Sequence, residues 1–144
     1  MSEFGLSREA RALGFTGALL FLAGLAQGAA ITFFANPRMA LSAHLDAVQS
    51  GMAVMVAGLL WSSCTWRAAI ETVARWTMAA GMVGLWLGLT LAAATGASRA
   101  LPMAGRGFSG TPLAEQVTNG LVLGSSAALF VGWGLFTVAL IRRR

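Results

Sequence analysis

Four long apolar runs, separated by short polar links, constrain what this chain can fold into. The runs cover about residues 13–35, 37–61, 76–97 and 117–141. Each run contains the roughly 20 mostly apolar residues that a helix needs to cross a membrane. Only 10% of the 144 residues are charged, against roughly 25% in soluble domains. The sequence therefore predicts an all-α integral membrane protein, a single domain (residues 1–144) of four transmembrane helices.

The polar links predict where the helices end. Asn36-Pro37 ends the first run and also starts the second, with Asn36 as the N-cap and Pro37 at the first helical position. The one long loop is expected at residues 98–116, and a loop of this length in a compact protein often has a function.

Arginine residues are distributed unequally between the two ends of the helices. All ten basic residues are arginine, and the net charge is +5. They lie at the edges of the apolar runs, so membrane lipid is the expected partner and nucleic acid is not. Seven are expected on the side of the termini (Arg8, Arg11, Arg67, Arg75 and Arg142 to Arg144) and three on the other (Arg38, Arg99 and Arg106). This excess predicts a multi-pass protein of a bacterial inner membrane with both termini in the cytoplasm.

Glycines at four-residue spacing predict close contacts between helices. Such pairs allow backbones to approach within a membrane, where lipid offers no hydrophobic drive for association. The pairs are Gly24 with Gly28, Gly84 with Gly88, and Gly120 with Gly124. The contacts can lie within one subunit or between subunits, and some of the glycines could instead clear space for a flat ligand.

His44 is the only histidine, and it lies inside the second apolar run. It is about 10 Å along the predicted helix, toward the side opposite the termini. An ionisable side chain inside a span is costly and is a functional candidate; the alternative is a neutral histidine hydrogen-bonded to a neighbouring helix or loop. Gly51 and Gly58 follow on nearly the same face, so the imidazole is expected above two bare backbone patches.

One histidine limits the metal sites that this chain can form. A zinc site needs three or four protein ligands, and no cluster of Cys, His or carboxylate residues accompanies His44. A bis-histidine haem is excluded within one chain. A haem with His44 as its one protein ligand is compatible with the sequence, because the porphyrin supplies four ligands. The sequence is therefore compatible with two roles for His44, as a haem ligand or as a histidine that packs between helices.

Two acidic residues have structural explanations. Asp46 is the only acid inside a span, and it is expected to pair with an arginine of the same membrane side or with Ser50 or Gln49. Glu115 lies near the start of the fourth helix, where the helix dipole favours a negative charge.

Two sets of residues resemble the hydroxylaminobenzene mutase family. The first resembles the second helix of that family and comprises Ala43-His44-Leu45-Asp46, Gly51 and Gly58-Leu59-Leu60-Trp61. The second resembles its third helix and following loop and comprises Trp86, Pro102-Met103-Ala104-Gly105-Arg106-Gly107, Gly110 and Gln116. The resemblance spans about residues 13–141. Styrene oxide isomerases are a related group with the same spacing from histidine to glycine.

The resemblance implies a small membrane isomerase that forms a homotrimer with haem b near its subunit interfaces. It implies that His44 is the axial ligand of a ferric iron, which acts as a Lewis acid on the oxygen of a small apolar or aromatic substrate. An arylhydroxylamine would rearrange to an aminophenol, or an epoxide to a carbonyl compound. Gly51 and Gly58 would lie on the haem side. Arg99 and Arg106 would pair with the haem propionates, or else face solvent or lipid headgroups.

The chain departs from the family where polar groups are expected to orient the substrate. Ser50 replaces an asparagine, Val83 and Leu85 replace the tyrosine and asparagine of the mutases, and Leu89 lies near the position of the isomerases' tyrosine. The candidate catalytic replacements are Ser50, Thr90 and Asn119.

Two other functions fit the same residues. A non-enzymatic membrane haem protein, for electron transfer or gas sensing, would keep His44 without isomerising a substrate. A small multidrug-type transporter is also built from four short helices. Such transporters usually need a carboxylate inside the first helix, where the most polar residue here is Gln27.

Overall fold

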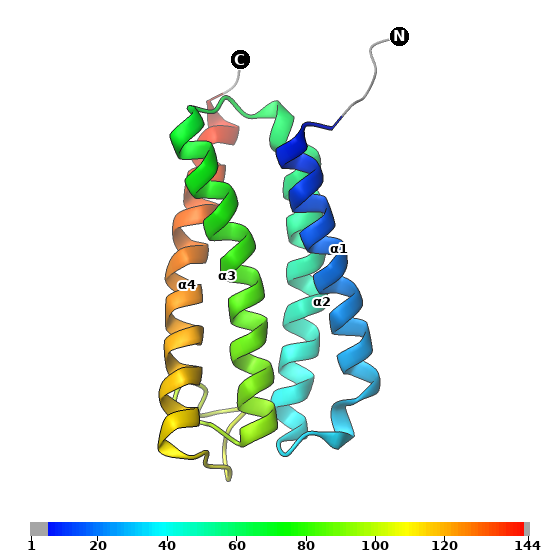
Figure 1. Ribbon diagram of the computed structural model, residues 1–144, viewed down its shortest axis with the longest axis vertical. Helices are drawn as coiled ribbons and strands as arrows, with labels where there is room; N and C mark the ends of the chain where they lie inside the picture. The colour runs from blue at the N-terminus through cyan, green and yellow to red at the C-terminus, as the bar shows by residue number, and fades with distance from the viewer. Residues whose placement is uncertain (1–5, 143–144) are drawn as a thin grey trace.

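The computed structural model describes residues 6–142, which form four long helices (Figure 1). They are α1 (Arg8–Ala29), α2 (Pro37–Leu60), α3 (Ala68–Thr95) and α4 (Pro112–Ile141), with short 3-10 helices η1 (Ile31–Phe33) after α1 and η2 (Trp61–Ser63) after α2. Residues 6–142 contain no strand. All four long helices are long and apolar enough to cross a membrane. The predicted class, all-α with four potential membrane spans, is confirmed.

Capping residues determine where the helices begin, and these positions differ from the ends of the apolar runs. Ser7 caps α1, so this helix begins before the run starting near residue 13, and it ends at Ala29 before η1. Thr111 caps α4 and shortens the long loop to residues 96–111. The Asn36 cap is confirmed, because its side chain accepts a hydrogen bond from the backbone N–H of Met39. Hydropathy indicates which residues can lie within the membrane, whereas the N-cap residue determines where the hydrogen bonding of the helix begins.

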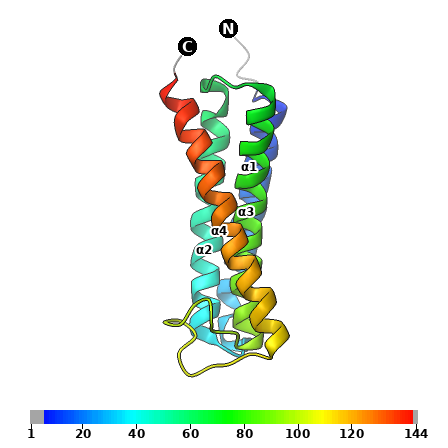
Figure 2. The same ribbon diagram turned by 90° about the vertical axis from the view of Figure 1, so that its left-hand side faces the viewer.

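The four helices form two antiparallel hairpins, α1–α2 and α3–α4 (Figures 1 and 2). The hairpins meet mainly through α2 and α3, and α4 packs mainly on α3. We call the end where α1 begins and α4 ends the terminal end, and the opposite end the loop end. His44 lies in the half of α2 nearer the loop end.

Glycines bring α1 and α2 into backbone contact. A Cβ added to Gly51 would lie 2.7 Å from the carbonyl oxygen of Gly17, and a Cβ added to Gly58 would lie 2.9 Å from that of Ala10. These distances are too short for any side chain, so α1 covers both positions. The patches expected to be bare are therefore covered by α1 in this structure, and Gly51 and Gly58 serve as helix contacts. Their predicted place beside a cofactor stays a prediction.

The predicted glycine pairs differ in what they contact. A Cβ on Gly24 would lie 2.8 Å from that of Ala47, so this part of α1 packs closely on α2. By contrast, Gly120 and Gly124 on α4 have nothing within 4 Å of an added Cβ. The same spacing therefore marks a contact within the chain on α1 and an open stripe on α4.

Glu115 anchors the long loop. Its carboxylate is buried and accepts hydrogen bonds from the backbone N–H groups of Ser98, Arg99 and Gly110, at 3.0 to 3.1 Å. The helix dipole, which was the expected explanation for Glu115, is thus only part of its role. The carboxylate satisfies backbone donors that the irregular loop would otherwise leave unpaired.

Candidate functional site

The imidazole of His44 leans from α2 onto α1. Its Nδ1 lies 2.7 Å from the carbonyl oxygen of Gly24. A Cβ on Gly28 would lie 2.7 Å from the same nitrogen, so the ring occupies space that only glycine leaves free. Because a carbonyl oxygen can only accept, Nδ1 carries the proton and donates it to Gly24. The lone pair of the neutral ring is then on Nε2.

This arrangement is typical of a histidine that ligates a metal. Such histidines almost always donate their second N–H to a carbonyl or carboxylate, which fixes both the tautomer and the ring orientation. The His44 ring is only half-buried, and Nε2 has no hydrogen-bond partner among residues 6–142. Those residues also contain no cluster of three His, Cys, Asp or Glu side chains that could hold a metal ion. His44 therefore suits a metal whose other ligands come from a prosthetic group.

A buried polar cluster joins α1 to α3 next to this site. Gln27 is 6% exposed and precedes Gly28, which contacts the His44 ring. The Gln27 side-chain oxygen accepts a hydrogen bond from Trp86 Nε1 at 2.6 Å, and its nitrogen donates to Thr90 Oγ1 at 3.2 Å. The predicted site residue Thr90 on α3 is thus held by a hydrogen bond to α1, at the residue before Gly28.

Trp86 also lines an apolar cavity of about 450 Å³ between α1 and α3. Its other lining residues are Phe15, Thr16, Leu19, Leu20, Ala23 and Val83. The hydrogen bond to Gln27 therefore sets the position of an aromatic wall. The sequence marks Gln27, Trp86 and Thr90 separately, but it does not predict that their side chains are hydrogen-bonded to one another.

Replacing Gln27 with leucine is expected to lower the free energy of unfolding by about 1 kcal/mol, the typical worth of hydrogen bonds between helices in a membrane. The indole of Trp86 would lose its acceptor inside an apolar environment. Unfolding in mixed micelles, followed by circular dichroism, measures this loss. Leu22→Ala on the same helix is a suitable control, because Leu22 is 60% exposed. A Gln27→Leu protein as stable as this control would contradict the structural role of the cluster.

Within residues 6–142, no hydrogen bond joins His44 to the remaining predicted site residues. Ser50 is buried, and its hydroxyl donates to Asp46 Oδ1 at 3.4 Å, which confirms the expectation that Asp46 can pair with Ser50. Asn119 is exposed, because α4 packs through Thr118 and turns its neighbour outward. The catalytic role predicted for Asn119 stays a prediction.

Arg99 and Arg106 have exposed side chains in the loop. The backbone N–H of Arg99 donates a hydrogen bond to Glu115, and the backbone carbonyl oxygen of Arg106 accepts one from the side chain of Arg38. Both guanidinium groups therefore remain at the surface of the loop end. Their predicted pairing with propionates stays a prediction.

Comparison with known proteins gives two kinds of match. The sequence model of the styrene oxide isomerase family matches residues 9–141. Hydroxylaminobenzene mutase HabA of Ectopseudomonas oleovorans is 33% identical over 128 residues, which cover 88% of this chain and 95% of that mutase. Hydroxylaminobenzene mutase HabB of the same organism is 33% identical over 132 residues, covering 88% of this chain and 80% of that protein. No solved structure matches.

Proposed function

Because the chain belongs to the styrene oxide isomerase family and is an isomerase of this kind, we propose that it rearranges a small apolar or aromatic oxygen-bearing substrate with haem b bound to His44. The reaction is the conversion of an arylhydroxylamine to an aminophenol, as the names of HabA and HabB suggest, or of an epoxide to a carbonyl compound. Either reaction is intramolecular and needs no cosubstrate.

The hydrogen bond from His44 Nδ1 to the carbonyl oxygen of Gly24 carries this proposal. It leaves the Nε2 lone pair for iron and holds the ring in one orientation, and Gly28 provides the room that the ring needs. Bound ferric haem supplies a Lewis acid that draws electron density from the oxygen of the substrate. Arg99 and Arg106 are the proposed partners of its propionates, since guanidinium pairs well with carboxylate.

Packing around His44 supports a proposed haem near a subunit interface, and the proposed homotrimer rests on the resemblance to the family and on the glycine-rich helix faces. The cavities described for this chain do not include His44 among their lining residues. Gly51 and Gly58 are covered by α1, and His44 is only half-buried, so a porphyrin at this histidine would lie on the outer surface of the helices, where a partner subunit can cover it. The open stripe at Gly120 and Gly124 on α4 offers a close contact to another copy.

The cavity between α1 and α3 supports an apolar substrate. Phe15, Val83 and Trp86 line it, and most of its surface is apolar. Apolar and aromatic walls of this kind favour an apolar or aromatic molecule. Gln27 accepts the hydrogen bond of Trp86 and so holds one wall of this cavity in place. We further propose that the protein lies in a bacterial inner membrane with both of its termini in the cytoplasm, because seven of its ten arginines are expected at the terminal end.

Spectroscopy combined with product analysis tests the proposal. The protein, purified in detergent after expression with a haem supply, is expected to show a Soret band and to convert hydroxylaminobenzene or styrene oxide. Because each product has the same mass as its substrate, chromatography is needed to separate the two compounds and NMR to identify them. A protein that binds haem and converts neither class would favour the non-enzymatic haem protein. A protein that takes up no haem would overturn the cofactor assignment.

A further inference from the structure

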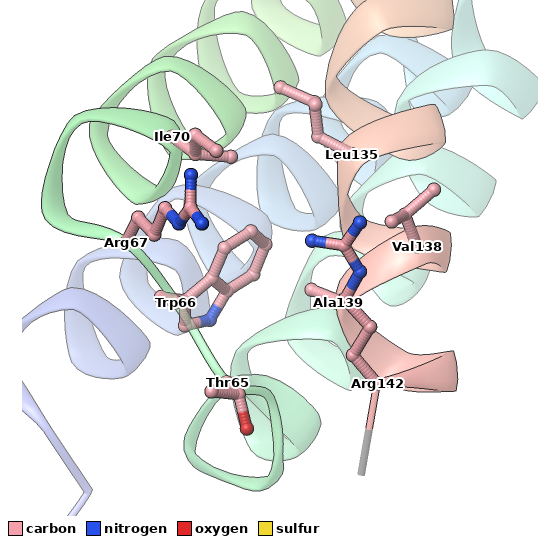
Figure 3. A pocket seen from close by; sticks show the side chains of 8 residues that line it. All are labelled: Thr65, Trp66, Arg67, Ile70, Leu135, Val138, Ala139 and Arg142. Carbon is pink, nitrogen blue, oxygen red and sulfur yellow. The ribbon is translucent and has the colours of Figure 1, made fainter.

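A separate cavity lies at the terminal end, between the start of α3 and the end of α4 (Figure 3). Its volume is about 190 Å³, and it is lined by Trp66, Arg67, Ile70, Leu135, Val138 and Arg142, together with two smaller residues. Figure 3 shows the guanidinium groups of Arg67 and Arg142 on opposite sides of the Trp66 ring. Two cations, one just before α3 and one just after α4, therefore line one cavity, and neither belongs to the His44 site.

The positive charge of this cavity is not neutralised by its own walls. The described residues that line it include no carboxylate. Glu71, one turn beyond Arg67, has an oxygen 2.8 Å from Trp61 Nε1 and accepts its hydrogen bond. An anion placed between Arg67 and Arg142 would supply the missing negative charge.

The opposite wall of the cavity is apolar and continues onto the outer surface of the helices. Ile70 is 37% exposed and Val138 is 46% exposed, and both belong to helices that can cross a membrane. The cavity thus has a cationic end at the membrane boundary and an apolar end toward the hydrocarbon. A ligand that matches both ends has an anionic headgroup and an acyl chain.

We propose that this cavity binds the phosphate group of one anionic phospholipid. Arg67 and Arg142 hold the phosphate oxygens, because the planar guanidinium can donate two parallel hydrogen bonds to a phosphate. The acyl chain lies along Ile70 and Val138. Bound in this way, the lipid links the beginning of α3 to the end of α4. The proposal does not depend on the isomerase reaction.

Native mass spectrometry of the full chain in detergent tests this site. The protein is titrated with palmitoyl-oleoyl-phosphatidylglycerol and, separately, with phosphatidylcholine carrying the same acyl chains. We expect one phosphatidylglycerol per chain to bind in preference to phosphatidylcholine. In the Arg67→Gln/Arg142→Gln protein this binding should weaken roughly 30-fold, the equivalent of about 1 kcal/mol for each arginine.

The Arg8→Gln/Arg11→Gln protein is the matched control. It loses the same charge at the same end, but its substitutions lie on α1, which does not line the cavity. Its binding of phosphatidylglycerol should equal that of the wild type. An equal loss in both double variants would mean that the attraction is unspecific and would overturn the proposal.

Two further results would also overturn it. Wild-type protein that binds phosphatidylcholine as well as phosphatidylglycerol has no site for an anionic headgroup. Displacement of phosphatidylglycerol by millimolar inorganic phosphate would identify a site for free phosphate instead of lipid. If the double variant fails to fold, Arg142→Gln alone decides, with an expected weakening of roughly fivefold.

Discussion

Replacing His44 with alanine should remove the Soret band of the purified protein and lower its isomerase activity at least about 100-fold. His44 is the only histidine of the chain, and its Nε2 is the one imidazole nitrogen left without a partner by the hydrogen bond to Gly24. Without that nitrogen the iron has no protein ligand at this position. Absorption spectra and product formation of the variant and the wild type, prepared side by side, measure both effects.

Two accompanying measurements separate ligation from a merely structural role of His44. Imidazole added to the His44→Ala protein should restore the Soret band, because the small molecule can enter the space left by the side chain. Gly28→Ala keeps His44 but places a methyl group 2.7 Å from its ring atoms, so we expect weaker haem retention in a folded protein. A His44→Ala protein that keeps an unaltered Soret band would disprove the assignment of the ligand.

The sequence could predict those features that depend on neighbouring residues. Hydropathy marks each span by itself, and Asn36-Pro37 marks a helix start because its N-cap and first helical position are adjacent. His44 could be singled out because it is the only histidine and lies in a span. Its tautomer could not be predicted, since the acceptor on Gly24 is 20 residues away and belongs to another helix.

Glycine spacing could not distinguish a ligand face from a helix contact. Gly51 and Gly58 have the pattern expected of both, and the two interpretations differ only in what lies opposite. In the structure that space is filled by α1. The same spacing on α4 leaves Gly120 and Gly124 open. The pattern therefore indicates that another group can approach the helix backbone, but it does not indicate whether that group is a helix or a ligand. The cluster of Gln27 and Thr90 was beyond prediction for a similar reason, because 63 residues separate the two side chains.

Replacing Gly17 with leucine should destabilise the protein by about 3 kcal/mol, near the upper end for overpacking. A Cβ at this position would lie 2.6 Å from the carbonyl oxygen of Gly51 and 2.9 Å from the backbone nitrogen of Met55. Backbone atoms of a helix cannot move aside individually, so α1 would have to separate from α2. Unfolding in mixed micelles with increasing fractions of SDS, followed by circular dichroism, gives the free energy.

Gly14→Leu is the matched control for Gly17→Leu, because it adds the same side chain to the same helix where nothing lies within 4 Å of an added Cβ. Its stability should change by no more than about 1 kcal/mol, the scale of the difference in helix propensity. The pair also tests the site, since separation of α1 from α2 would withdraw the Gly24 carbonyl from His44. Haem retention should therefore fall in Gly17→Leu and persist in Gly14→Leu. Equal stability and equal haem content in the two variants would show that the glycine contact neither holds the hairpin together nor orients His44.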